Sequence, residues 1–119
     1  MAGRFPVLTD ACVNEHLVRA LRDQGWDIVR AINLYPEKTE DEVLFARAAA
    51  DDRVFVANDR PAEAIAIRWL REGRRFRGMV AWSVETYERR SIGSLALEFD
   101  ALAKEQDPFA YPIRHLKAR

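Results

Sequence analysis

Cysteine, histidine and glycine are scarce in this chain, and each scarcity excludes a class of site. The 119 residues include one cysteine, Cys12, and two histidines, so no disulfide framework and no zinc site built from cysteines can form. The five glycines form no glycine-rich loop of the kind that cradles nucleotide phosphates. Disulfide scaffolds, cysteine zinc modules and P-loop enzymes are therefore excluded.

Long apolar runs and net charge are missing as well. No apolar run approaches the about 20 residues that a membrane helix needs, and the first residues lack the apolar stretch of a signal peptide. Basic and acidic residues number 19 each, so the formal net charge is zero and gives no argument for a polyanionic partner. We expect one domain over residues 1–119, in the reducing cytoplasm and without membrane association.

What the chain does contain is a regular alternation of short apolar runs and amphipathic stretches. The apolar runs predict strands at residues 5–9, 26–32, 54–57, 78–82 and 112–116. Helical spacing of apolar residues predicts helices over residues 14–24, 39–50, 61–72 and 91–102. Alternation of this kind indicates parallel strands with helices on both faces. The predicted fold is a three-layer α/β/α sandwich with a mainly parallel sheet of four to five strands.

Several helix ends carry recognisable stop and start signals. Gly25 and Gly73 stand where a helix ends in a left-handed residue, which favours glycine. Ser91 is placed to cap the last helix. Thr39 and Glu42 have the spacing of a reciprocal capping box, which predicts that a helix begins there.

Two predicted strands end in aspartates, at Asp10 and Asp59. If these strands are neighbours, both carboxylates lie at the edge where open parallel sheets bind ligands. Carboxylates held together repel one another and favour a hard cation such as Mg²⁺ or Mn²⁺. Further oxygen ligands or water contacts are expected from Glu40 or Asp41 and from Asn14 and Asn58. The competing interpretation is that these acids only cap helices.

Basic residues cluster at the end of the third predicted helix. The cluster contains Arg68, Arg71, Arg74, Arg75 and Arg77. It could neutralise phosphates of a nucleic acid, or it could be a solvated helix end whose cations favour the helix dipole. His16 and His115 show no spacing that would give them a metal or catalytic partner.

The order of four motifs carries a resemblance to a known family. These are Leu8-Thr9-Asp10 followed by Asn14, Trp26-Asp27-Ile28-Val29, Thr39 to Leu44, and Val54 to Arg60. Together they resemble the PIN-like proteins, which are related to the PIN-domain ribonucleases found as toxins in toxin–antitoxin pairs. The resemblance runs over nearly the whole chain and depends on motif order, because no single motif is specific.

The resemblance implies a PIN-type sandwich that hydrolyses RNA with one or two Mg²⁺ or Mn²⁺ ions. By position, Asp10, Asp59 and Glu40 (or Asp41) would hold the metal and form the catalytic site. Asn14, Asn58, Arg68, Arg71 and Arg75 would contact the substrate. It further implies an antitoxin-like protein partner, and a homodimer is plausible on general grounds.

Departures from the family pattern leave other functions open. The family has further polar or acidic residues at four positions that this chain fills with Ala11, Cys12, Ala57 and Pro61. About three carboxylates therefore remain, and such a set favours one metal ion over two. The first alternative is a non-catalytic PIN-like module that binds RNA or protein through a degraded acidic site. A phosphatase-like enzyme is the second alternative, although the chain lacks the Asp-x-Asp-x-Thr pattern of an aspartyl nucleophile.

Overall fold

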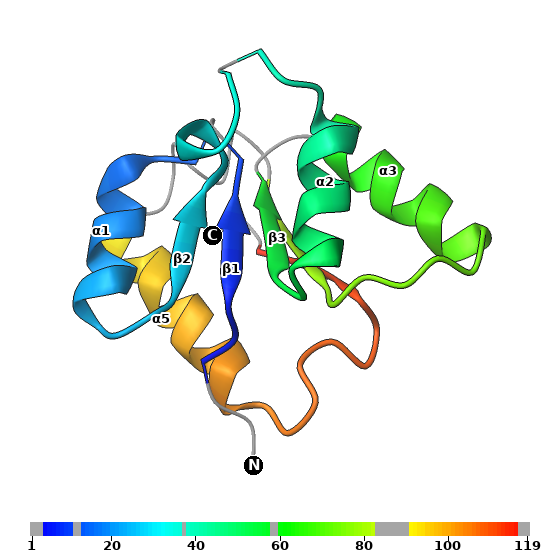
Figure 1. Ribbon diagram of the computed structural model, residues 1–119. Coiled ribbons are helices and arrows are strands. Elements are labelled where there is room, and N and C mark those ends of the chain that lie inside the picture. The colour runs from blue at the N-terminus through cyan, green and yellow to red at the C-terminus, as the bar shows by residue number, and fades with distance from the viewer. Residues whose placement is uncertain (1–3, 11–12, 37, 58–59, 83–90, 117–119) are drawn as a thin grey trace.

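The computed structural model describes residues 4–10, 13–36, 38–57, 60–82 and 91–116, with only the backbone at residues 60 and 61. The strands are β1 (Val7–Thr9), β2 (Ile28–Arg30), β3 (Val54–Ala57), β4 (Met79–Ala81) and β5 (Ile113–His115). The helices are α1 (Glu15–Asp23), α2 (Asp41–Ala50), α3 (Arg60–Arg71) and α5 (Ile92–Lys104), with a 3₁₀ turn η1 (Ala31–Asn33). Strands and helices alternate along the chain as the sequence predicts (Figure 1).

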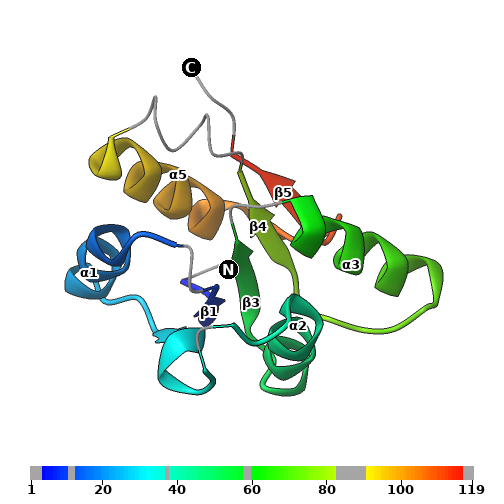
Figure 2. The same cartoon turned by 90° about the horizontal axis from the view of Figure 1, so that it is seen from above.

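The five strands form one sheet in the order β2-β1-β3-β4-β5, and every neighbouring pair is parallel. Helices α1 and α5 contact each other on one face of the sheet, and α2 and α3 contact each other on the opposite face (Figure 2). The predicted α/β class and the three-layer arrangement are therefore confirmed. The sheet is wholly parallel rather than mainly so.

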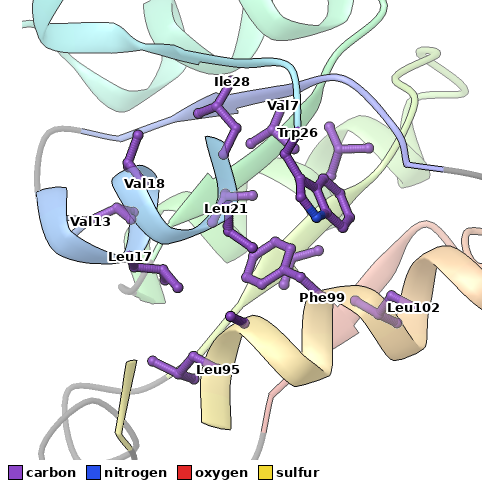
Figure 3. Packing of buried hydrophobic residues seen from close by; sticks show 14 of the residues in the cluster. Val7, Val13, Leu17, Val18, Leu21, Trp26, Ile28, Leu95, Phe99 and Leu102 are labelled. Carbon is purple, nitrogen blue, oxygen red and sulfur yellow. The ribbon is translucent and has the colours of Figure 1, made fainter. Parts of the chain in front are cut away.

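Each face of the sheet carries its own hydrophobic core. Side chains alternate along a strand, so Val7 packs under α1 and α5 while Leu8 packs under α2 and α3. Figure 3 shows the first of these cores, where Phe99 of α5 meets Trp26 and Leu21. Both faces of the central strands are buried, which explains why they are continuous apolar runs without alternation in the sequence.

The helix ends at Gly25 and Gly73 form as predicted. Gly25 has a φ of 96° and Gly73 a φ of 69°, both in the left-handed region. The Gly25 amide donates to the Arg22 carbonyl at 2.9 Å, and the Trp26 amide donates to the Leu21 carbonyl at 3.1 Å. This pair of bonds is a Schellman motif.

Two local predictions are wrong. The Thr39 hydroxyl donates to the Pro36 carbonyl at 2.7 Å, so it closes the preceding turn and does not cap α2. The N-cap is Glu40, which makes no side-chain cap bond. The predicted strand at residues 26–32 keeps three residues of strand, because β1 pairs with it only up to Arg30 and the chain then turns into η1.

Candidate functional site

The change of winding direction lies between β1 and β3. From β1 the chain passes through α1 to β2 on one side, and then returns through α2 on the opposite face to β3 on the other side. Helix α2 begins near the upper, carboxyl ends of the strands (Figure 1). The two connections diverge at the carboxyl ends of β1 and β3, which is where open α/β sheets bind ligands.

Asp10 lies at this point. Its amide donates to the Val56 carbonyl of β3 at 2.9 Å, which continues the pairing of β1 with β3 by one residue. Its exposed fraction is 4%, and with Thr9 it makes up the buried polar residues in the described part of the chain. Because Asp10 ends a central strand at the place where open α/β sheets bind ligands, it is a candidate ligand-binding residue.

Asp59 and Asn58 lie outside the described residues. Ala57 ends β3 and Arg60 begins α3. The predicted neighbourhood of β1 and β3 is confirmed. The closeness of the Asp10 and Asp59 carboxylates stays a prediction.

The remaining acidic candidates begin α2. Asp41 is its first residue and is half-buried, whereas Glu40 is exposed. Within residues 4–10, 13–36, 38–57, 60–82 and 91–116, no group of three His, Cys, Asp or Glu side chains could hold a metal ion. The fit of a divalent ion at this edge therefore depends on Asp59.

Asn14 caps a helix, and its predicted contact with the substrate stays a prediction. Its Oδ1 accepts from the His16 amide at 2.7 Å, which caps α1. The side chain is exposed. Asn14 thus follows the capping interpretation that applies to polar residues at helix starts.

The arginine cluster does not gather at the Asp10 edge. Helix α3 leads away from that edge for about 18 Å at 1.5 Å per residue, and the chain then enters β4 at the lower ends of the strands (Figure 1). Arg71 and Arg75 are exposed near this far end. Arg68 forms an ion pair with Glu42 of α2, and this hydrogen bond raises the pKa of Arg68. The structure separates Arg71 and Arg75 from Asp10.

A histidine–carboxylate pair was missed by the sequence analysis. His115 at the carboxyl end of β5 lies with its Nε2 2.9 Å from Oε1 of Glu63, in the first turn of α3. Three strand spacings of about 4.8 Å separate β5 from β1, so this pair lies about 14 Å from Asp10. A sequence separation of 52 positions between the partners hides the pair from any local motif. Only the expectation that both elements meet the same sheet edge could have indicated it.

No protein-family model, curated protein or solved structure matches this chain. The α/β fold with its parallel sheet is established by the structure, and the resemblance to PIN-like proteins stays a prediction. Among the described helices, none combines the length and apolar character that crossing a membrane requires.

Proposed function

We propose that the protein is a metal-dependent ribonuclease of the toxin type, with its catalytic site at the carboxyl ends of β1 and β3. The observation that carries the proposal is the buried carboxylate of Asp10, at the point where the connections diverge. Helix capping alone does not require the capping residue to be buried, whereas Asp10 is 4% exposed and ends a central strand where open α/β sheets bind ligands.

The proposed ligands are Asp10, Asp59 and one acid at the start of α2. Asp41 is the better third ligand, since it is half-buried and Glu40 is exposed. With three carboxylates, one Mg²⁺ or Mn²⁺ ion balances the charge better than two. A bound ion of this kind supplies a Lewis acid for the phosphate and lowers the pKa of the attacking water. The chain itself would hold the carboxylates together and keep bulk water from the Asp10 side.

Cleavage of a labelled single-stranded RNA with Mn²⁺ tests the proposal. Asp10→Asn and Asp59→Asn should each reduce the rate by more than the about 10–100-fold that loss of an outer-shell metal partner causes. Asp23→Asn is the matched control. Asp23 is an exposed acid at the opposite end of α1, so its variant should cleave like the wild type.

Metal binding and folding are measured on the same variants. Calorimetric titration with Mn²⁺ should show saturable heat in the wild type and in Asp23→Asn, and none in Asp10→Asn. Thermal unfolding of Asp10→Asn shows whether lost activity reflects lost structure. Cleavage that survives in both site variants, or in chelator, would refute the proposal.

The second candidate function is a non-catalytic module that binds RNA or a protein partner. It is favoured by Ala57 at the end of β3, where the resembled family has threonine. The module predicts RNA binding that is unchanged by chelator and by Asp10→Asn. Binding assays with and without chelator therefore separate the two functions.

A further inference from the structure

A hollow of about 470 Å³ lies beside the amino ends of the strands, at the opposite end of the sheet from Asp10. Its lining includes the segment from Gly73 to Arg77, which joins α3 to β4, together with Asp52 before β3 and Pro112 before β5. The volume falls within the about 300–1,000 Å³ that is typical of small-molecule sites. The hollow is therefore large enough for a ligand of the size of a nucleotide.

The lining carries a surplus of positive charge. Three arginines line the hollow, against one acid, Asp52. Arg77 is paired with Asp52, with 3.2 Å between Nη1 and Oδ2, and Arg74 forms a longer pair of 3.5 Å with Glu72. No carboxylate of a described residue forms an ion pair with Arg75, which is exposed. A ligand for this hollow should therefore carry at least one negative charge, and guanidinium groups match phosphate oxygens well.

The hollow also offers a flat stacking surface. The Arg74 guanidinium lies 3.7 Å from the centre of the Trp69 ring. The Arg74 side chain is 47% exposed and lines the hollow, whereas Trp69 is 5% exposed and is not among the lining residues. Beside it, Phe76 is half-buried and held by the rings of Phe45 and Trp69. A guanidinium plane fixed on one side by an aromatic ring is a platform on which a nucleobase can stack.

We propose that this hollow binds a nucleoside 5′-phosphate, either as a free nucleotide or as one unit of a single strand. The base would stack on Arg74 beside the apolar wall of Phe76 and Leu70. The phosphate would be held by Arg75 and Arg77. The site is independent of the proposed catalytic site, because it lies at the opposite edge of the sheet and contains one acid in its lining.

Calorimetric titration of the full chain, in low salt and with chelator present, tests this proposal. Adenosine 5′-monophosphate should bind at least tenfold more tightly than adenosine or inorganic phosphate, because each of these lacks one half of the recognised group. Arg75→Gln should weaken binding of the monophosphate about tenfold or more through loss of a charged hydrogen bond. Arg74→Lys keeps the charge and removes the plane, so it should weaken the monophosphate and leave inorganic phosphate unchanged.

Control variants and a second probe complete the design. Arg19→Gln changes an exposed arginine on α1, on the other face of the sheet, and should bind like the wild type. Asp10→Asn should also bind normally, which separates this proposal from the ribonuclease proposal. A five-nucleotide oligoadenylate that binds at least tenfold more tightly than the monophosphate identifies a strand as the source; equal binding identifies the free nucleotide.

Three outcomes would overturn the proposal. The first is no binding of either nucleotide probe to the wild type. The second is binding that Arg75→Gln leaves unchanged. The third is binding of hexaglutamate as tight as that of the monophosphate, which would make the hollow a site for acidic peptides.

Discussion

Gly78 offers a sharp test of the packing between β4 and the loop before β5. This buried glycine immediately precedes β4. A Cβ added there would lie 2.4 Å from Cδ1 of Phe109 and 2.6 Å from its Cγ. Carbon atoms in good contact lie about 3.5–4.0 Å apart, so the Phe109 ring has to move by about 1 Å or more in Gly78→Ala.

The cost of that movement follows from what the ring touches. Phe109 packs edge-to-face on Phe5, with 5.0 Å between ring centres, and Phe5 packs in the same way on Trp26 at 4.9 Å. Forcing an extra methyl group into such packing costs about 1–3 kcal/mol. Replacing glycine by alanine returns about 0.4–1 kcal/mol by restricting the unfolded chain. We expect a net loss of about 1–2 kcal/mol in the free energy of unfolding.

Urea denaturation followed by tryptophan fluorescence measures this loss. Gly93→Ala is the matched control, because the nearest atom to its added Cβ is 4.0 Å away; its stability should be unchanged or higher by up to about 1 kcal/mol. Phe109→Leu provides a smaller, more adaptable side chain. Combined with Gly78→Ala, this substitution should recover part of the lost stability, because the effects of substitutions at residues in contact do not simply add. Equal stability of Gly78→Ala and the wild type, or strict additivity in the double variant, refutes the reasoning.

Two further predictions concern the same half of the molecule. Phe99 is fully buried, and its ring contacts Trp26 at 5.7 Å and Trp82 at 6.2 Å between ring centres. Phe99→Ala should therefore lower the free energy of unfolding by about 3–5 kcal/mol, as measured by urea denaturation. The hydrogen bond from Arg114 lowers the pKa of Glu105, so this pair stabilises the folded state above the ordinary glutamate pKa of about 4.3. That contribution is well under about 1 kcal/mol for such an exposed pair. It should disappear as the pH falls through the lowered pKa of Glu105, and it should be absent in Glu105→Gln. Unfolding measured between pH 2 and pH 6 follows both effects.

Much of the fold follows from local patterns in the sequence. Strand β3 begins and ends where its apolar run does, and Gly25 and Gly73 end their helices as their positive φ angles require. Thr39 shows the limit of such patterns. The predicted partner of its hydroxyl oxygen was an amide donor, but the hydroxyl could also donate to the nearby Pro36 carbonyl, and it does so. The spacing of a capping box cannot decide between two local partners.

The candidate site is predictable only in part. That Asp10 ends a central strand follows from the sequence, because its apolar run is followed directly by an acid. That Asp10 is buried beside β3 follows from the strand order, which places β1 between β2 and β3. The arginine cluster shows the opposite case, since closeness in sequence to the end of β3 did not bring Arg71 and Arg75 to the Asp10 edge.

The amino-acid sequence by itself determined the elements and their layering, because helical periodicity, apolar runs and glycine positions act over a few residues. Tertiary structure alone decided which distant side chains meet. His115 with Glu63, and Arg77 with Asp52, are joined by the order of parallel strands. The common direction of the parallel strands separates the two ends of the sheet, with Asp10 at the carboxyl end and the arginine-lined hollow at the amino end. Strand order is a global property of packing two cores against one sheet, so no short stretch of sequence encodes it.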